Sequence, residues 1–189
     1  VICIEAALYA TGLSVNYYTN DFAFTKLKPF AKKDWEAFFK KASNAGTAGT
    51  AGKSKDSLEK LDITGSDQML RNVEASKKNA KLAGVDKLIS FSRIDVDWVD
   101  TKFDKNAVDL VVSRIPCPSK HTPEQKARKI YKEMLYQLEF VMKKGGRLAF
   151  LTENTSLFKE MLTQYFKLVS EDELWAGEQR YQFVMVEKN

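Results

Sequence analysis

Cysteine and histidine are scarce in this sequence. Its 189 residues include two cysteines, Cys3 and Cys117, and one histidine, His121. Two cysteines so far apart in the sequence form no disulfide framework, which predicts a reducing compartment and a cytoplasmic location. His121 has no cysteine or carboxylate neighbour at the spacing of metal ligands, so we expect no metal site.

Long apolar runs and hydrolase motifs are also missing. No apolar run approaches about 18 residues, so we expect no membrane span, and no signal-peptide pattern is visible. The G-x-S-x-G motif of serine hydrolases does not occur. The sequence starts at Val1 rather than Met, and its apolar beginning predicts further sequence upstream.

The composition is that of a folding chain with a basic surface. It is 44% hydrophobic and 12% aromatic, which predicts one folded domain over residues 1–189. The formal net charge of +5 favours a polyanionic partner, and a solvated lysine-rich surface is the alternative.

A low-complexity stretch interrupts the chain at residues 43–57, which read SNAGTAGTAGKSKDS. Small residues and glycines dominate it, so it predicts a flexible surface loop. The alternative is a phosphate-binding loop built on Gly52-Lys53-Ser54. That pattern requires glycine five residues before Gly52, where the sequence has Thr47.

Strand and helix patterns alternate along the rest of the chain. Residues 1–10 predict a helix, and Asp34 predicts the N-cap of a short helix. Strands are expected at residues 61–67, 88–91, 107–112 and 147–152, the third of them buried on both faces. Helices are expected at 68–83, 122–143 and 155–165, the second ended by Gly145 and Gly146. Strands at 166–171 and 180–187 predict a closing hairpin. This order predicts an α/β fold with a mostly parallel sheet and one antiparallel edge strand.

Two acidic residues follow strands of the expected sheet. Ligands of open parallel sheets bind at the carboxyl ends of the strands. Asp67 can accept hydrogen bonds from both ribose hydroxyls of an adenosine ligand, or it is the N-cap of the next helix. Asp95 can accept from an adenine amino group while Ile94 packs on the ring, or it is a turn residue in an acidic loop.

A proline-rich loop follows the third strand in the stretch DLVVSRIPCP, residues 109–118. Such a loop can stack on a flipped base while a polar side chain and a backbone carbonyl accept from the base amino group. An ordinary strand end with a proline stop is the alternative.

Four segments together resemble a known family. They read VICIEAAL, NDFAFTKLKPFAKKDWEAFF, ITGSDQMLRNVEASKKNAKLAGV and MKKGGRLAFLT. They resemble the putative RNA methylases that usually carry an N-terminal THUMP domain, and the resemblance covers most of the chain. It implies a Rossmann-like class I methyltransferase sheet whose first strand and glycine-rich loop precede Val1.

The resemblance also implies a cofactor, a substrate and site residues. The cofactor would be S-adenosylmethionine and the substrate tRNA, methylated on a guanine N2 amino group. Asp67 and Gln68 would bind the ribose, and Ile94 and Asp95 the adenine. Ser113 to Cys117 would line the target pocket, with Arg114, Ile115, Pro116 and Cys117 at the positions of the catalytic tetrad. Glu5 would support the preceding loop.

The tetrad departs from the family pattern of Asn/Asp-Pro-Pro-aromatic. Arg114, Ile115 and Cys117 replace Asn/Asp, Pro and the aromatic residue, and only Pro116 matches. Arginine has five donors and no acceptor, so Arg114 cannot accept from a guanine amino group.

Three functional hypotheses therefore stay open. They are an active RNA methyltransferase, an inactive module of the same fold that binds RNA or a partner protein, and a methyltransferase for protein or small molecules. Four basic residues after the loop can contact RNA phosphates or form a solvated helix face: Lys120, Lys126, Arg128 and Lys129.

Overall fold

A computed structural model describes residues 1–11, 21–30, 32–41, 61–120, 122–162 and 164–189. The predicted flexible loop at 43–57 and His121 lie outside the described residues. The chain forms two compact units, Val1–Arg93 and Ile94–Asn189, and each is described by itself.

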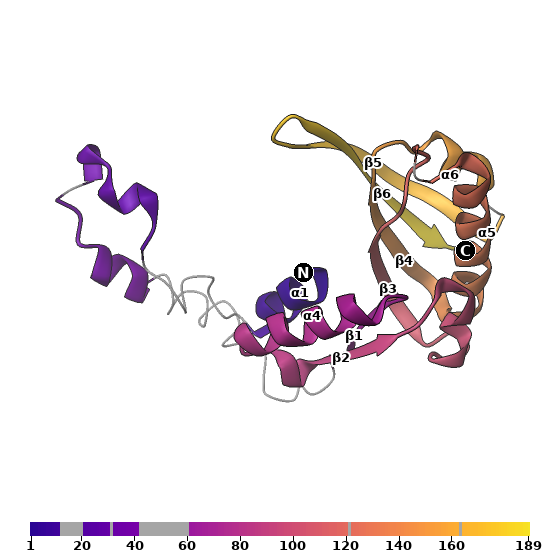
Figure 1. Ribbon diagram of the computed structural model, residues 1–189, viewed down its shortest axis with the longest axis horizontal. Helices are drawn as coiled ribbons and strands as arrows, with labels where there is room; N and C mark the ends of the chain where they lie inside the picture. Colours follow the sequence, from indigo (N-terminus) through magenta and orange to yellow (C-terminus); the bar gives the residue numbers. More distant parts are fainter. Residues whose placement is uncertain (12–20, 31, 42–60, 121, 163) are drawn as a thin grey trace. The chain divides into compact units, whose positions relative to one another are not determined.

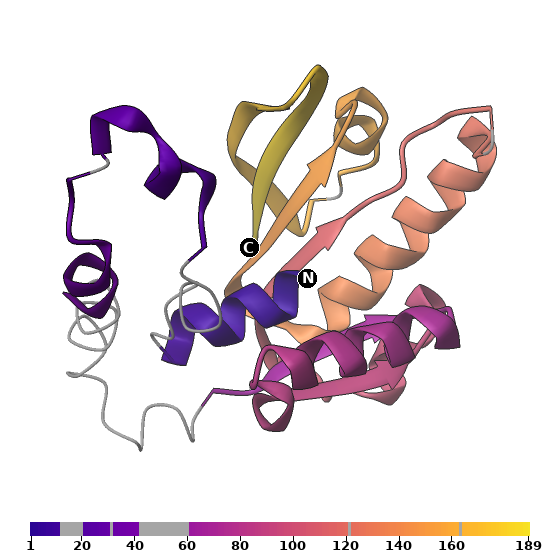
Figure 2. The ribbon, with the colours of Figure 1, turned by 60° about the vertical axis from the view of Figure 1, so that its left-hand side comes forward.

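The first unit contains a parallel strand pair joined by a helix. Strand β1 (Ile63–Asp67) is followed by helix α4 (Leu70–Leu82), the 3-10 turn η4 (Asp86–Leu88) and strand β2 (Ile89–Arg93). The strands pair in parallel, from Ile63 opposite Ile89 to Asp67 opposite Arg93. Figure 2 shows α4 lying along the two strands. The predicted strand–helix–strand order is confirmed here.

Helix α1 (Ile2–Thr11) belongs to the same unit and shares its core. Ile4 and Ala7 of α1 pack in one cluster with Ala80, Val85 and Ile89. The apolar residues of α4 recur at helical spacing, so α4 turns one apolar face to this cluster, whereas α1 is apolar over most of its surface. The sequence signal for a helix at the start of the chain is confirmed.

Residues 21–41 carry a separate group of aromatic contacts. Turns η2 (Ala23–Lys26) and η3 (Lys28–Phe30) precede a helix at 35–41. The Oδ1 atom of Asp34 accepts from the amide of Ala37 at 2.9 Å, which confirms the predicted N-cap. The Trp35 ring lies within 5.2–6.1 Å of four phenylalanine rings, those of Phe24, Phe30, Phe38 and Phe39.

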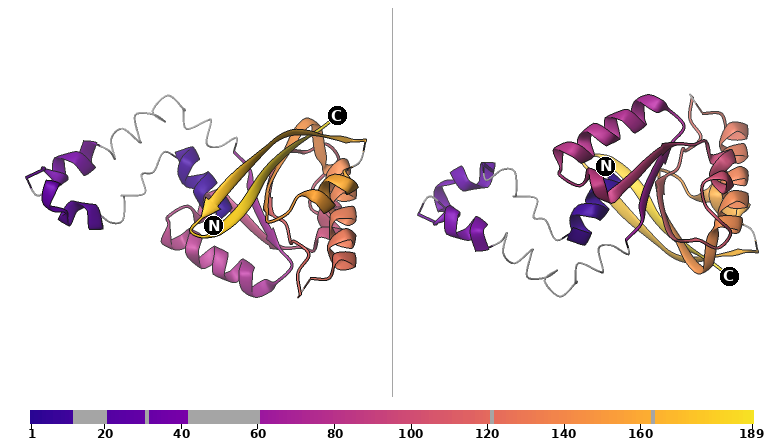
Figure 3. Two further views of the ribbon diagram at one scale, coloured as in Figure 1. Left: turned by 90° about the horizontal axis from the view of Figure 1, so that it is seen from above. Right: turned by 90° about the horizontal axis from the view of Figure 1, so that it is seen from below.

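The second unit is a four-stranded sheet covered by two helices. Its elements are η5 (Val96–Thr101), β3 (Val108–Arg114), α5 (Glu124–Val141), β4 (Met142–Thr152), α6 (Ser156–Met161), β5 (Phe166–Ala176) and β6 (Gln179–Lys188). The strand order is β3-β4-β6-β5. Strands β3 and β4 are parallel, and β6 is antiparallel to both β4 and β5. Helices α5 and α6 cover the same face of this sheet (Figures 1 and 3).

The core of the second unit lies between α5, α6 and the sheet. Tyr131 of α5, Phe150 of β4 and Phe158 of α6 are fully buried. The Phe158 ring lies 4.3 Å from the Phe150 ring and 5.7 Å from the Tyr131 ring, measured between centroids. Burial of three large side chains contributes about 1.5–3 kcal/mol each to stability.

Two local predictions in this unit were wrong. Strand β3 is not buried on both faces, because α5 and α6 cover one face of the sheet (Figure 1) and the side chains of Leu110 and Val112 on the other face are exposed. Gly145 and Gly146 do not end α5, which stops at Val141. They lie within β4 at an irregularity in its pairing with β3, and Gly145 takes a φ of 73° there.

Tyr131 also holds the loop that follows β3. Its hydroxyl donates a hydrogen bond to the carbonyl of Pro116. The side chain of Ile115, one residue earlier, is buried in the same core. The start of the proline-rich loop is therefore anchored from inside the unit.

Substitution of Gly65 by alanine should destabilise the first unit. A Cβ atom at Gly65 would lie 2.8 Å from two ring carbons of Phe91 and 3.1 Å from the Cys3 Sγ atom. We expect Gly65→Ala to lower the free energy of unfolding by about 1–3 kcal/mol, the usual cost of overpacking. Urea unfolding followed by circular dichroism measures it.

The close contact also predicts that substitutions at Gly65 and Phe91 have non-additive effects on the free energy of unfolding. Phe91→Leu should recover part of the loss in the Gly65→Ala background, so a double-mutant cycle should show a favourable coupling. Ser66→Ala on the same strand is the control. An unchanged unfolding midpoint for Gly65→Ala would contradict the packing described here.

Substitution of Tyr131 by phenylalanine should change how stability depends on pH. Burial raises the pKa of Tyr131 from 10 to about 12. The unfolded chain releases this proton first, so the stabilisation is fully present below pH 10 and is lost as the pH rises from 10 to 12. Tyr131→Phe should therefore lose less stability across that interval than the wild type.

At neutral pH the same variant should be less stable by about 0.5–1.5 kcal/mol, because the hydrogen bond to Pro116 is lost. Urea unfolding at neutral and alkaline pH measures both effects. Tyr136→Phe is the matched control, since Tyr136 lies on the same helix with 69% of its surface exposed. Parallel alkaline curves for wild type and Tyr131→Phe would refute the assignment.

Candidate functional site

The carboxylate of Asp67 is oriented by its own helix. Its Oδ1 atom accepts from the amide of Met69 at 2.8 Å, and the Nδ2 atom of Asn72 lies 3.1 and 3.0 Å from its two oxygens. Helix α4 begins at Leu70 with Met69 as N-cap, so Asp67 stabilises the first turn from outside the helix. A carboxylate has about four acceptor positions and these contacts use three, so Asp67 retains about one position for a hydroxyl donor.

Gln68 links the ends of the two strands in this unit. Its carbonyl accepts from Arg93 Nε at 3.0 Å, while its side chain is exposed. Asp67 and Gln68 therefore lie together at the carboxyl end of β1, as predicted. Glu5, the other acidic candidate of this unit, is exposed on α1.

Asp95 and Ile94 begin the second unit. The Oδ1 atom of Asp95 accepts from the amide of Val96 at 2.7 Å and so caps η5. The buried side chain of Gln137 holds this turn to α5, because it donates to the Asp97 carbonyl at 3.0 Å and accepts from the Asp100 amide at 2.8 Å. The position of Asp95 is therefore set by packing on α5.

Residues 113–117 differ in how far their side chains are exposed to solvent. Ser113 and Cys117 are half-buried, and Arg114 and Pro116 are exposed. The side chain of Ile115 is 4% exposed and packs in the core. The Ile115 side chain is therefore not available to a ligand. The Ile115 amide donates a hydrogen bond to the Leu151 carbonyl at 3.2 Å.

Arg114 meets two residues that the sequence analysis did not single out. Its Nη2 atom lies 3.4 Å from Glu153 Oε1, and its guanidinium carbon lies 5.3 Å from the centre of the Tyr181 ring. Glu153 directly follows β4, and Tyr181 lies on β6. Glu153 follows a strand, as Asp67 and Asp95 do, so the sequence alone could have indicated it as a site residue.

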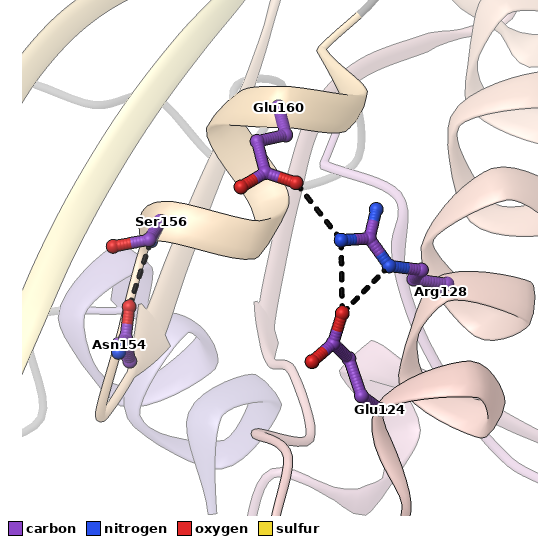
Figure 4. Close-up of polar contacts among 5 residues, drawn as sticks. All are labelled: Glu124, Arg128, Asn154, Ser156 and Glu160. Carbon is purple, nitrogen blue, oxygen red and sulfur yellow. Dashed lines mark hydrogen bonds and ion pairs between the residues drawn. The ribbon is translucent and has the colours of Figure 1, made fainter.

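One of the four basic residues after the loop is engaged within the protein. Arg128 donates to Glu124 of α5 and to Glu160 of α6, each at 2.9 Å (Figure 4). These carboxylates, Glu160 foremost, raise the pKa of the Arg128 guanidinium. Lys120, Lys126 and Lys129 are exposed and have no ion pair within the described part of the chain.

Two further observations bear on the kind of site. Among the described residues, no three histidine, cysteine, aspartate or glutamate side chains are placed to hold a metal ion. Within those same residues, no helix has both the length and the apolar character that crossing a membrane requires.

Several solved structures share this fold. A possible methylase from Clostridium difficile 630 is 19% identical, covers 100% of this chain and 45% of its own, and has a TM-score of 0.74. SMU.472, a putative methyltransferase complexed with SAH, is 21% identical over 97% of this chain and 44% of its own, with a TM-score of 0.73. TrmN from Thermus thermophilus is 21% identical, and the match covers 78% of this chain and 41% of TrmN, with a TM-score of 0.61. These likenesses confirm the Rossmann-like α/β fold.

The chain spans less than half the length of each of these three proteins. No curated protein matches the sequence. A family model described as the RMKL-like methyltransferase domain matches residues 1–176, which is most of the chain. The resemblance read from the sequence is thereby confirmed, and this chain belongs to the RMKL-like methyltransferase domain family.

Proposed function

We propose that residues 1–189 form one methyltransferase domain that transfers the methyl group of S-adenosylmethionine to RNA. The substrate class is tRNA, and the acceptor is the N2 amino group of a guanine. The match of the methyltransferase family model to residues 1–176 carries the proposal. SMU.472, which has the same fold, was solved with SAH, the product of S-adenosylmethionine after methyl transfer.

Asp67 supports the choice of cofactor. Its carboxylate is an acceptor held in place by Met69 and Asn72, and its remaining acceptor position suits a ribose hydroxyl donor. Asp95 offers an exposed carboxylate for the adenine amino group, and Ile94 is beside it in the sequence for the ring. Each carboxylate, taken within its own unit, has the acceptor chemistry for a part of S-adenosylmethionine. The cofactor supplies an activated methyl group when bound.

The charge of the chain supports an RNA substrate. Lys120, Lys126 and Lys129 are exposed next to the proline-rich loop and are available to phosphates. Such contacts make binding weaken steeply as salt is raised.

A second candidate is a module that binds RNA without transferring a methyl group. The observation that favours it is Arg114, whose side chain has only donors and is engaged with Glu153 and Tyr181. In this case S-adenosylmethionine would have no function in the chain. Cofactor binding therefore separates the two candidates.

The first test is calorimetric titration of S-adenosylmethionine into the intact protein. We expect saturable binding, and we expect Asp67→Ala to weaken it about tenfold or more, because hydrogen bonds to a charged acceptor are lost. Asp62→Ala is the matched control, since Asp62 is exposed just before β1. Absence of binding by the folded wild type would refute the methyltransferase proposal in favour of the RNA-binding module.

The second step tests the substrate. Unmodified tRNA is incubated with S-adenosylmethionine labelled in its methyl group, and the labelled nucleoside is identified. We expect N2-methylguanosine. Label in another nucleoside would correct the acceptor, and label that appears only in protein or small molecules would refute the RNA substrate.

A further inference from the structure

Methyl transfer to an amino group needs a hydrogen-bond acceptor beside that group. The nitrogen lone pair forms a bond to the methyl carbon, and the electrons of the carbon–sulfur bond stay on sulfur. The nitrogen then carries an extra proton, which must leave for the product amine to become neutral. An acceptor that orients the amine and receives this proton therefore belongs at the site.

Arg114, the last residue of β3, cannot fill this role. Its guanidinium has five N–H donors and no acceptor. Its Nη2 atom lies 3.4 Å from Oε1 of Glu153, so the guanidinium is already beside a carboxylate.

Register brings three side chains to one end of the sheet. Arg114 of β3 lies opposite Leu151 of β4, two residues before Glu153. Thr152 of β4 lies opposite Gln182 of β6, directly next to Tyr181. The Arg114 guanidinium lies over the Tyr181 ring and beside Glu153, so adjacent strands set the position of the carboxylate.

The other acceptors near these strand ends are engaged or weaker. Asn154 Oδ1 accepts from the Ser156 amide at 2.8 Å, as Figure 4 shows. The Pro116 carbonyl accepts from Tyr131, and Glu171 accepts from Thr155 and Lys159. Ser113 offers a neutral hydroxyl, which is a weaker acceptor than a carboxylate.

Glu153 differs from all of these. Its side chain is 47% exposed, and Arg114 is its one interaction partner among the described residues. Since a carboxylate has two oxygens and the contact uses Oε1 alone, Oε2 is open to a ligand.

We propose that Glu153 is the acceptor for the target amino group in this chain, in place of the acceptor that Arg114 does not provide. Arg114 and Tyr181 hold the carboxylate in position, and the proton released from the amine passes to Glu153 and then to solvent. The inference rests on the proposed function, because it names a residue of the same reaction.

The test compares two nucleotides that differ only in the amino group. Guanosine 5′-monophosphate and inosine 5′-monophosphate are titrated into the intact protein saturated with S-adenosylhomocysteine, and binding is followed by NMR or calorimetry. We expect the wild type to bind the guanosine nucleotide about tenfold more tightly, the size of one hydrogen bond to a charged group. Glu153→Ala should remove this preference, and Glu153→Gln, which keeps an acceptor oxygen, should retain part of it.

Glu160→Gln is the matched control, because Glu160 is also an exposed carboxylate paired with one arginine, Arg128. It should keep the full preference. A preference that survives in Glu153→Ala, or a wild type that binds S-adenosylhomocysteine and both nucleotides equally, would overturn the role of Glu153 alone. A folded wild type that does not bind S-adenosylhomocysteine would overturn the proposed function and this inference with it.

Discussion

The hydrogen bond from Tyr131 to the Pro116 carbonyl joins the packing of the second unit to the loop at its candidate site. Tyr131 is fully buried against Phe158, so its hydroxyl cannot move without disturbing the core. The carbonyl in turn fixes the path of the chain directly after β3. Packing between α5, α6 and the sheet is therefore what holds the loop in one conformation.

In the first unit, by contrast, the candidate carboxylate is held by residues close to it in the sequence. Asp67 is held by Met69 and Asn72, both within five residues of it in the sequence. Gly65 lets β1 approach Phe91 closely enough for the strand pair and α1 to pack. The short motif Gly-Ser-Asp thus combines a packing requirement with an oriented carboxylate, and both are readable from a few neighbouring residues.

A donor-only guanidinium and a carboxylate lie side by side at the end of β3, because Arg114 contacts Glu153, the residue directly after β4. The sequence resemblance implies that family members have an acceptor at the position of Arg114. Both groups are about half exposed, so the pair by itself adds little to stability. In the proposed function, this contact is important because it sets the position of the Glu153 carboxylate.

The fold class, the alternation of strands and helices and the place of Asp67 at the end of β1 could all be predicted from the sequence. These follow from apolar periodicity and from residues close together in the chain, which act through local geometry. The sequence did not reveal that β3 is an edge strand with Leu110 and Val112 exposed, because strand order depends on pairing between distant segments. The contacts of Arg114 with Glu153 and Tyr181 were likewise decided only by tertiary structure, since the register of three strands brings together residues that are far apart in the chain.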